Sequence, residues 1–512
     1  MQLKRFLPDP VSSLALGSGL LLALSFPRPD VASLAWFALV PLFMVMNERP
    51  FHTGFLAGTG FFGLVLYWLN IVMTTYGRLH PVLSVVVYLL LVAYLSLFFG
   101  AATWAACYCR EKLGFSTIIT LPVFWVALEF VRSFLLTGFP WATLGYSQQS
   151  HLALIQSADL VGPYGLSFLL ILSNASLARA GCEILQKRFS NLPWTALLVT
   201  ASMFAANLEY GFFRLDHQVD ERSKSAETLL VQGSIDQSVK WNPAYQARTI
   251  AIYRDLSMPE SESPATDLII WPESAVPFFF QEGGALAEAV LQVPVQTGAY
   301  LLMGSPAYEA GSEGEQYLNS AFLLSPEGRI LGRSDKVHLV PFGEYVPLGR
   351  LLPFVDKLVV GIGDFSPGKV SPLQMNGGRI GVLVCFESIF PELARDYVRQ
   401  GSDLLVNITN DAWFGRSSAP YQHLAMSRFR AVENRVWVAR AANTGISAFI
   451  SPSGEIVAKS PLFERLALKG QVGLGAQPTI YTRFGDILPI LCLILSAGWL
   501  VYARLFSGKR KL

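Results

Sequence analysis

Charged residues are scarce in this sequence. Only 15% of the 512 residues are Asp, Glu, Lys or Arg, and 52% are hydrophobic. A soluble protein carries about 25% charged residues, so a large share of this chain is predicted to lie in lipid. The net charge of +2 is small, which argues against a nucleic acid as the main partner.

The sequence also lacks the patterns that hold metals, cofactors or disulfides. Its five cysteines and six histidines show no Cys-x-x-Cys or Cys/His ligand spacing, and no nucleotide motif is present, so we expect no metal and no other cofactor. Four of the cysteines fall in or beside apolar segments, which argues against a disulfide framework; they are Cys107, Cys109, Cys182 and Cys492. Cys385 is the remaining one, and it lies in the polar part of the chain.

The sequence contains several long apolar segments. A bilayer-spanning helix needs about 20 apolar residues, and we predict about eight such helices. Their ranges are 10–27, 31–47, 52–73, 81–108, 117–136, 160–180, 193–212 and 486–506. A signal peptide is the alternative for the first, although no small-residue cleavage site follows it. The sequence thus predicts a polytopic α-helical membrane domain, formed by residues 1–212 and 486–512.

Basic residues are unevenly divided between the two sides of this membrane domain. Eleven Lys and Arg residues fall in segments on the side of the N-terminus, and Arg28 and Arg78 fall on the other side. Because Lys and Arg stay on the cytoplasmic side, both termini are predicted to be cytoplasmic. The polar block 213–485 is then expected in the periplasm of a bacterium that carries the protein in its inner membrane.

The block 213–485 has the composition of a soluble domain and alternates between strand and helix patterns. Short apolar runs predict strands at 228–231, 267–271, 300–304, 320–324, 329–331, 380–385, 403–408, 436–441 and 446–450. Helical patterns lie at 242–257, 284–297, 389–400 and 420–434. Strands that alternate with helices predict an α/β layered domain.

The segment 340–369 fits neither a single strand nor a single helix. It is rich in Pro and Gly, yet its Leu, Val and Phe side chains make it too apolar for a solvated loop. Two interpretations remain open. The segment is either an apolar lid that lies on a membrane or covers an acyl chain, or an ordinary packed excursion of the domain.

Glu129 and Arg132 are ionisable residues inside a predicted membrane helix, where such residues are rare. Their i,i+3 spacing places both on one helix face. We expect them either to pair with each other or to organise the outer loop 137–146.

Three reactive side chains of the block 213–485 stand at or shortly after the end of a predicted strand: Glu273, Lys336 and Cys385. Alone, each has a structural explanation, as a solvated glutamate, a surface lysine or a buried thiol. Together they supply a base, a fixed positive charge and a nucleophile, which are the parts of acyl transfer through a thioester. The base matters because a free thiol, with a pKa near ~8.5, is mostly protonated at neutral pH.

Four motifs carry a resemblance to a known family. They are W-P-E-S at 271–274, D-K-V-H-L-V-P-F-G-E at 335–344, C-F-E at 385–387 and N-D-A-W-F-G at 410–415. In this order they resemble the Glu-Lys-Cys triad of the nitrilase superfamily. With the predicted membrane helices, the chain resembles the apolipoprotein N-acyltransferase family over essentially its whole length. The resemblance implies that the periplasmic α/β domain is a nitrilase-like αββα sandwich.

Residue roles follow from this resemblance, position by position. Glu273 would be the general base, Lys336 the lysine that stabilises the oxyanion, and Cys385 the acylated nucleophile. Glu344 is similar to the second glutamate of the family, which helps to hold the lysine.

Four further residues match supporting positions of the family. Glu387 and Trp413 match functional positions, and Trp241 matches a tryptophan beside the site. Phe386 follows the nucleophile where some members have tyrosine, so an aromatic wall is expected there without a hydroxyl. For Trp241 and Trp413, packing in the core or at an interface is the alternative.

The implied reaction is an acyl transfer in two steps. A phospholipid, usually phosphatidylethanolamine, would donate an acyl chain to Cys385. The thioester would pass that chain to the α-amino group of the S-diacylglyceryl-cysteine at a lipoprotein N-terminus, the last step of lipoprotein maturation. The expected partners are therefore a phospholipid donor, a diacylated apolipoprotein acceptor and the lipid bilayer.

Two alternatives interpret the same sequence differently. A membrane-tethered amidase or nitrilase would use the same three residues to hydrolyse a small periplasmic amide. A transporter or receptor would carry an inert α/β domain, although the membrane segments lack the paired helices, broken by Gly or Pro, of a transport path, and Glu129 and Arg132 are the charged residues singled out inside them.

Overall fold

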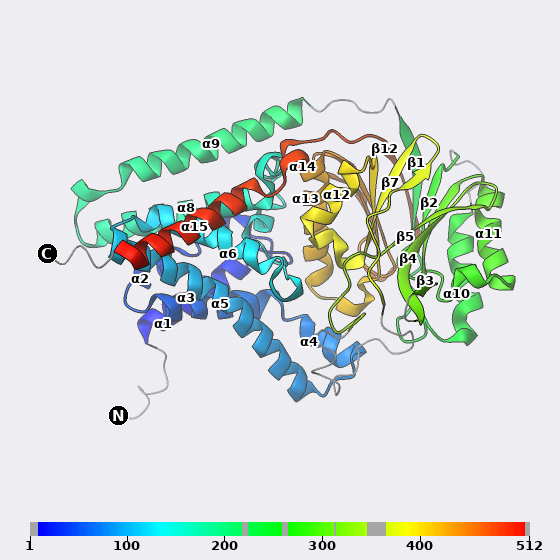
Figure 1. The fold of residues 1–512 in the computed structure, drawn as a ribbon, viewed down its shortest axis with the longest axis horizontal. Coiled ribbons are helices and arrows are strands. Elements are labelled where there is room, and N and C mark those ends of the chain that lie inside the picture. The colour runs from blue at the N-terminus through cyan, green and yellow to red at the C-terminus, as the bar shows by residue number, and fades with distance from the viewer. Residues whose placement is uncertain (1–8, 218–223, 259–264, 312–313, 346–364, 507–512) are drawn as a thin grey trace. The chain divides into compact units, whose positions relative to one another are not determined.

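The chain forms two compact units, whose elements are drawn in Figure 1. The structure is a computed structural model, and it describes residues 9–217, 224–258, 265–311, 314–345 and 365–506. The helical unit comprises Met1–Asn70, His80–Asp216 and Phe484–Leu512, and the sheet unit comprises Ile71–Leu79 and His217–Arg483.

The helical unit is built mainly from apolar helices. They are α1 (Pro10–Ala23), η2 (Ala32–Trp36), α2 (Val40–Val45), α3 (Pro50–Val65), α5 (Pro81–Leu113), α6 (Thr117–Arg132), η4 (Leu135–Thr137), η5 (Leu144–Gln148), α7 (Leu152–Ile155), α8 (Ala158–Leu185), η6 (Phe189–Asn191), α9 (Trp194–Asp216) and α15 (Ile487–Phe506). The short α4 (Leu69–Ile71) leads into η3 (Val72–Tyr76), which belongs to the sheet unit.

Among the described residues, four helices are long and apolar enough to cross a membrane: α5, α8, α9 and α15. The number rises to five if α3 and the segment Leu69–Tyr76, bent by 57°, count as one span. The predicted helices at 10–27 and 117–136 are present as α1 and α6, but these have 14 and 16 residues. The count of about eight spans therefore stays a prediction.

The predicted helix at 31–47 is divided in the structure. Residues Phe37–Leu39 separate η2 from α2, and the φ of Phe37 is −144°. The side chain of Asn174 satisfies two backbone groups at this break. It accepts a hydrogen bond from the N–H of Leu39 and donates one to the carbonyl of Ala35, each at 2.8 Å. A break in an apolar region needs such a partner, since lipid offers no hydrogen bonds.

Glu129 and Arg132 of α6 both hold the loop that follows this helix. The guanidinium of Arg132 donates to the carbonyl of Trp141 at 2.7 Å, and a carboxylate oxygen of Glu129 accepts from the N–H of Leu144 at 2.9 Å. Both side chains are buried. These bonds confirm the expectation that the pair organises the loop 137–146, and the charges of Glu129 and Arg132 also attract each other.

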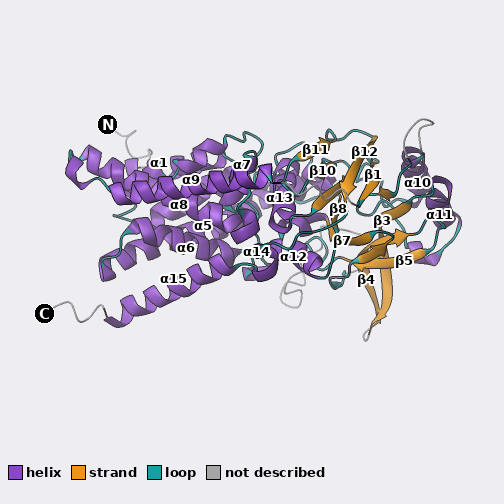
Figure 2. Cartoon of the chain, turned by 90° about the horizontal axis from the view of Figure 1, so that it is seen from above, coloured by secondary structure: helices purple, strands orange, loops and turns teal. Residues whose placement is uncertain are grey.

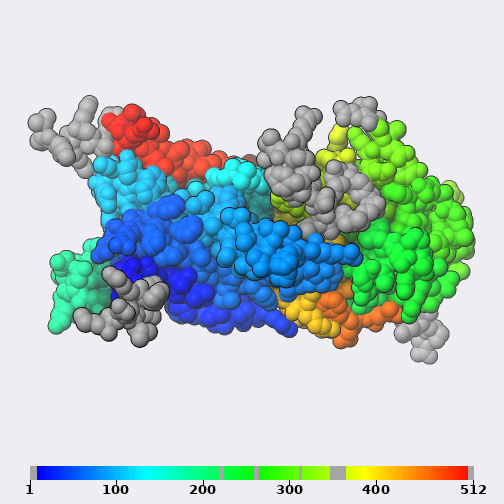
Figure 3. All heavy atoms as spheres, turned by 90° about the horizontal axis from the view of Figure 1, so that it is seen from below, coloured from blue at the N-terminus to red at the C-terminus, as the bar shows by residue number. Residues whose placement is uncertain are grey.

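Large apolar side chains lie on the outside of the helical unit. Val82 and Leu90 of α5 are each 66% exposed. Figure 3 shows α5, in blue, on the face seen from below. Exposed side chains of this kind match lipid better than water, which agrees with a membrane protein.

The sheet unit contains two six-stranded sheets with helices on their outer faces, as Figure 2 shows. The first sheet has the order β12-β1-β2-β3-β4-β5, and the second has the order β11-β10-β9-β8-β7-β6. The strands are β1 (Ser225–Gln232), β2 (Leu268–Ile270), β3 (Tyr300–Gly311), β4 (Gly314–Leu324), β5 (Ile330–Asp335), β6 (Leu373–Met375), β7 (Gly378–Val384), β8 (Leu404–Thr409), β9 (Trp437–Ala442), β10 (Ala448–Ile450), β11 (Ile456–Lys459) and β12 (Leu466–Gly473). The helices are α10 (Pro243–Ser257), η7 (Phe280–Glu282), α11 (Ala285–Thr297), η8 (Cys385–Ile389), α12 (Pro391–Arg399), η9 (Asp411–Phe414), α13 (Ala419–Asn434) and α14 (Ile480–Phe484).

Alternation along the strands creates two apolar cores. In β1, Leu230 joins Val382 and Val406 of the second sheet, in the core between the sheets. The next residue, Val231, belongs instead to the core under α10 and α11, with Tyr253. Successive side chains of a strand point to opposite faces, so one strand serves both cores. On the second sheet α12 packs against β7 and β8 and α13 against β9, which completes an αββα sandwich.

The nine strands and four helices predicted for the block 213–485 are all present, and the prediction omits β6, β11 and β12. β12 pairs antiparallel with β1, with Leu468 opposite Leu230, so the end of the sheet unit closes on its beginning. In β12 the polar and glycine residues Lys469–Gln471 interrupt the apolar pattern from which strands are predicted.

The apolar segment 340–369 is described at its two ends. At the first end, the N–H of Val340 donates to the carboxylate of Glu344 at 2.8 Å. At the second, the N–H of Gly368 donates to the carbonyl of Lys336 at 2.8 Å. The part of this segment at 346–364 lies outside the described residues, so both interpretations of it stay predictions.

Candidate active site

Three strand ends bring Glu273, Lys336 and Cys385 together in the sheet unit. They follow β2, β5 and β7, in that order. The Nζ atom of Lys336 lies 3.8 Å from Oε1 of Glu273. Both of these charges shift the pKa of the Cys385 thiol, so all three groups share one electrostatic environment. The three residues are 6%, 1% and 9% exposed, which makes this a nearly closed site.

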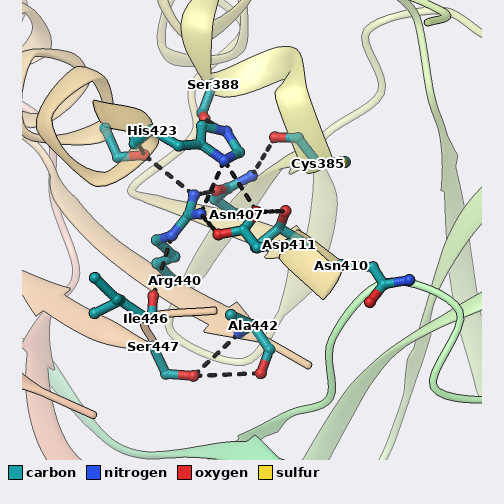
Figure 4. A network of polar contacts seen from close by, with 12 residues as sticks. Cys385, Ser388, Asn407, Asn410, Asp411, His423, Arg440, Ala442, Ile446 and Ser447 are labelled. Carbon is teal, nitrogen blue, oxygen red and sulfur yellow. Dashed lines mark hydrogen bonds and ion pairs between the residues drawn. The ribbon is translucent and has the colours of Figure 1, made fainter. Parts of the chain in front are cut away.

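Cys385 stands at a sharp turn between β7 and η8. Its φ of 57° lies in the left-handed region, which a residue other than glycine adopts when its surroundings enforce it. The side-chain amide of Asn407, on β8, donates to the carbonyl of Cys385 at 3.0 Å (Figure 4). It also donates to the carbonyl of Leu383 at 2.8 Å. These two bonds hold both sides of the turn.

The carboxylate of Glu387 joins the end of β7 to the chain that follows β5. One oxygen accepts from the N–H of Val384 at 2.6 Å. The other accepts from the N–H groups of Val337 at 2.6 Å and His338 at 2.9 Å. Burial raises the pKa of Glu387 to about 7, although these hydrogen bonds lower it. Glu387 thus ties together the two segments that carry the nucleophile and the lysine.

Lys336 is a buried ammonium group between two carboxylates. It donates to Oε1 of Glu344 at 2.9 Å and lies 3.8 Å from Glu273. Burial lowers the pKa of Lys336, but the carboxylates of Glu344 and Glu273 outweigh burial and raise it above its ordinary value. The site therefore keeps a fixed positive charge at neutral pH, which suits the stabilisation of an oxyanion.

Glu273 is held on three sides. Its Oε1 atom accepts from the side-chain amide of Asn319 at 2.8 Å, and Oε2 accepts from the N–H of Asn410 at 3.0 Å. Its main-chain carbonyl accepts from the ammonium group of Lys240 at 2.9 Å. A Cβ atom on Gly304 of β3 would lie 2.7 Å from the Cα of Glu273, so the close approach of this strand requires glycine.

The cysteine of this site rests as a thiol. Burial and the carboxylate of Glu273 raise the pKa of Cys385, and Lys336 lowers it to a smaller extent. A thiol must lose its proton before it attacks a carbonyl carbon. The carboxylate of Glu273 is a suitable proton acceptor for this step.

Phe386 forms an aromatic wall beside Lys336. Its ring centroid lies 5.9 Å from the Nζ atom of Lys336. It also forms an edge-to-face pair with the ring of Phe390, at 5.1 Å. The ring is half-buried, so one part of it remains exposed.

The two predicted tryptophans lie in different surroundings within the sheet unit. Trp241 is half-buried and directly follows Lys240, which holds the main chain of Glu273. The ring of Trp413 in η9 lies 5.3 Å from the ring of Tyr76 in η3.

Four residues that hold the site are missing from the predictions: Asn319, Asn407, Asn410 and Lys240. All four side chains are buried. Asn319 and Asn407 interrupt apolar strand patterns, and a polar side chain inside such a pattern needs a buried partner. The sequence therefore contains a signal that these residues are buried and hydrogen-bonded. It does not show which groups they bond to, because each of them bonds to a distant part of the chain.

The polar groups that meet here are one thiol, several carboxylates, two ammonium groups and several amides. Within the part of the chain that the structure describes, no group of three or more His, Cys, Asp or Glu residues is placed to hold a metal ion. The arrangement supplies a nucleophile, a base and a cation, which are the requirements of covalent acyl transfer.

Two family models match the chain. The model of the apolipoprotein N-acyltransferase N-terminal domain matches residues 18–176, and the carbon-nitrogen hydrolase model matches residues 230–475. A relative from Geobacter metallireducens, named apolipoprotein N-acyltransferase, is 48% identical over 504 residues, which cover 98% of this chain and 96% of the relative. A relative of the same name from Nitrosomonas europaea is 34% identical over 495 residues, which cover 95% of this chain and 94% of the relative.

Solved structures also match the chain. The crystal structure of Saccharomyces cerevisiae Nit3, a member of branch 10 of the nitrilase superfamily, is 20% identical to it, with a TM-score of 0.37. The match covers 52% of this chain and 95% of that one.

Proposed function

Since this chain belongs to the apolipoprotein N-acyltransferase family, and is thus an acyltransferase that acts on lipoproteins, we propose that it works through a thioester on Cys385. The proposed acyl donor is a phospholipid, with phosphatidylethanolamine as the usual one. The proposed acceptor is the α-amino group of the S-diacylglyceryl-cysteine at a lipoprotein N-terminus. The convergence of Glu273 and Lys336 on Cys385 is the observation that carries this proposal.

In the first half-reaction the acyl chain moves from the phospholipid to the enzyme. Glu273 takes the proton of the Cys385 thiol, and the sulfur attacks the ester carbonyl carbon of the phospholipid. Lys336 stabilises the negative charge that develops on the carbonyl oxygen. The bond to the glycerol oxygen then breaks, that oxygen takes the proton from Glu273, and a lysophospholipid leaves. The products balance as one thioester and one alcohol.

In the second half-reaction the acyl chain moves to the lipoprotein. The α-amino group has a pKa near ~7.7–8.0, so part of it is an unprotonated nucleophile at neutral pH. Its nitrogen attacks the thioester carbon, Glu273 takes a proton from the nitrogen, and the carbon–sulfur bond breaks. Cys385 recovers its proton from Glu273, and the product is an amide.

The supporting residues are proposed to prepare these steps. The carboxylate of Glu344 accepts from the ammonium group of Lys336 at 2.9 Å. The carboxylate of Glu387 connects the segment after Lys336 with the turn that carries Cys385. Phe386 is proposed as the aromatic wall of the acyl site, and Trp241 and Trp413 as its substrate-binding tryptophans.

We also propose a placement in the membrane. Residues 1–212 and 486–512 would form about eight spans of the bacterial inner membrane, with both termini in the cytoplasm and the catalytic domain 213–485 in the periplasm. The bias of basic residues supports this orientation. Donor and acceptor are both anchored in lipid, which explains why the catalytic domain is tied to a membrane part. The apolar segment 340–369 would keep water from the thioester until the amine arrives.

Intact-protein mass spectrometry tests the proposal directly. Purified full-length protein is incubated with phosphatidylethanolamine alone, and we expect a mass increase of one acyl group on Cys385. Neutral hydroxylamine should remove the group, because it cleaves thioesters, and Cys385→Ala should not acquire it. A diacylated lipopeptide added afterwards should clear the adduct and become acylated at its amine.

The contrary outcomes are distinct. An acyl adduct on Cys385→Ala would show that another residue is the nucleophile. Release of lysophospholipid without transfer to the peptide amine would favour a membrane-tethered hydrolase. The absence of an adduct with every phospholipid tested would overturn the thioester.

A further inference from the structure

A buried ion pair lies next to the turn that carries Cys385. Arg440 of β9 and Asp411 of η9 are 0% and 1% exposed, and the guanidinium Nη2 atom donates to Oδ2 of Asp411 at 2.7 Å (Figure 4). Burial raises the pKa of Asp411, but Arg440, His423 and the hydrogen bond from Thr409 together outweigh burial and hold it below the ordinary range. Neither charge takes part in the steps proposed above. Removing two charges from water carries a large free-energy penalty, so a buried ion pair is weak evidence for a role in stability alone.

Arg440 determines how the amide of Asn407 points. The two residues are opposite each other in the parallel pairing of β8 with β9. The guanidinium Nη1 atom donates to Oδ1 of Asn407. An amide whose oxygen faces a donor must turn its NH₂ group the other way, and here that group donates to the carbonyls of Leu383 and Cys385. Arg440 therefore orients the group that holds the turn of the nucleophile.

Asp411 helps to position Glu273, the proposed base. Its Oδ1 atom accepts from the hydroxyl group of Thr409 at 2.9 Å, so the carboxylate is bound from two directions. Between these two residues stands Asn410, whose N–H donates to Oε2 of Glu273 at 3.0 Å. A Cβ atom on Gly445 would lie 2.4 Å from Oδ2 of Asp411, so the close contact of this carboxylate with the main chain requires glycine. The position of Asp411 thus directs the N–H that holds the base.

The same carboxylate also reaches η8. His423 of α13 has its Nδ1 atom 3.1 Å from Oδ1 of Asp411 and its Nε2 atom 2.8 Å from the hydroxyl oxygen of Ser388 (Figure 4). Burial and Arg440 lower the pKa of His423, so the imidazole is neutral. Ser388 is fully buried, so this Ser-His-Asp arrangement offers no second nucleophile to a substrate. It is instead a second link between Asp411 and η8, the helix that begins at Cys385.

We propose that the Arg440–Asp411 ion pair is a positioning device that keeps Cys385 and Glu273 in register for proton transfer. Through Asn407 the pair holds the carbonyl of the nucleophile, and through the main chain beside Asp411 it holds the carboxylate of the base. Arg440 and Asp411 act through these neighbours, so they are positioning residues. The inference rests on the proposed function, in which the base takes the proton of the thiol.

The test uses Arg440→Lys, Asn407→Ala and the double variant, each in the full-length protein. Lysine keeps the charge, but its ammonium group lacks the planar fork that reaches Asn407 and Asp411 together. Single-turnover formation of the thioester from phosphatidylethanolamine is measured as a function of lipid concentration. Each single variant should lower the maximal rate by roughly 10–100-fold, because misplaced reacting groups cost about this much. The half-saturating lipid concentration should stay unchanged, since neither residue binds the lipid.

The double variant distinguishes positioning from general support of the fold. If Arg440 acts through Asn407, the rate of the double variant should equal that of the slower single variant. Arg428→Lys is the matched control, because Arg428 is a buried arginine of α13 that donates to the carbonyl of Gly454 at 2.8 Å. It should lower the melting temperature as Arg440→Lys does, but leave the rate of thioester formation unchanged.

Several outcomes would overturn the device. The first is a double variant whose loss of rate equals the product of the losses in the two single variants, because the two effects are then independent. The second is an equal loss of rate in Arg440→Lys and Arg428→Lys. If Arg440→Lys does not fold, Asn407→Ala is measured alone, and a normal rate in this variant is decisive against the proposal. A wild type that forms no thioester contradicts the proposed function itself. A wild type that forms it, with unaffected variants, contradicts only the device.

Discussion

The side-chain amide of Asn319 donates at 2.8 Å to the carboxylate of Glu273. The same nitrogen atom donates at 2.9 Å to Glu344. A neutral residue thus stands between the two carboxylates that flank the ammonium group of Lys336. This arrangement keeps the base oriented without adding another charge to a nearly closed site.

Asn319→Asp should therefore inactivate the enzyme while it preserves the size of the side chain. A third carboxylate cannot donate to the other two, and like charges so close raise the pKa of the group between them. We expect the rate of thioester formation to fall by ~100-fold, as when one oriented donor of a catalytic site is lost. Part of the activity should return at lower pH, as one carboxyl group takes up a proton. An unchanged rate at neutral pH would contradict this role of Asn319.

Gly304→Ala should separate activity from folding. The new Cβ atom would lie 2.5 Å from the nitrogen of Ser274 and 2.7 Å from the Cα of Glu273, so the base must move. Overpacking of this kind costs about 1–3 kcal/mol of stability, and the displaced base should cost the enzyme most of its activity. The control is Gly332→Ala on β5, where the nearest atom is the flexible end of Leu373 at 3.1 Å. Equal activity in the two variants would refute the argument.

Glu273→Gln should have opposite effects on two reactions of Cys385. Loss of the carboxylate removes one cause of the raised pKa of the thiol, so alkylation by iodoacetamide should begin at a lower pH. Acyl transfer loses its base, and its rate should fall by about 10²–10⁴-fold. The measurements are the pH profile of alkylation and the rate of thioester formation. A parallel fall in both would indicate damage to the fold instead.

Lys240 predicts a pH dependence of stability. Burial lowers the pKa of Lys240 to about 8, whereas a lysine in an unfolded chain titrates near ~10.4. Between these two values the unfolded chain binds more protons at this residue, so its contribution to stability rises with pH through that window. The melting temperature of the wild type relative to Lys240→Met should therefore be higher near pH ~10 than near pH ~7.

The control for this prediction is Lys459→Met, which removes an exposed lysine of β11. Its melting temperature relative to the wild type should show no such rise between the two pH values. If the melting temperatures of the wild type and Lys240→Met differ by the same amount at both pH values, burial does not destabilise the ammonium group of Lys240.

Much of the fold follows from local pattern. The apolar run at 380–385 predicts β7 and the placement of Cys385 near its end, because burial of a strand requires consecutive apolar side chains. The division of the helix predicted at 31–47 could not be read in the same way. It depends on Asn174, a residue of α8 far along the chain that bonds to the backbone at the break.

The candidate site shows the same limit. The reactive residues stand in recognisable motifs, whereas the residues that hold them bond across long separations. Lys240 and Glu273 are 33 positions apart, and Asn410 and Glu273 are 137 positions apart. Sequence patterns of strands and helices contain no information about such pairs, since each pattern depends on neighbours within a few residues.

By itself, the sequence determined the chemical class of the site, the apolar helices and most strands of the sheet unit, because side-chain chemistry and hydrophobic periodicity are local properties. Only the tertiary structure decided which buried polar groups meet. It placed Arg440 beside Asn407 by pairing β9 with β8, and it brought Asn410 against Glu273 by stacking one sheet on the other. The physical reason is that a buried hydrogen-bonding group must find a partner wherever the packed chain supplies one.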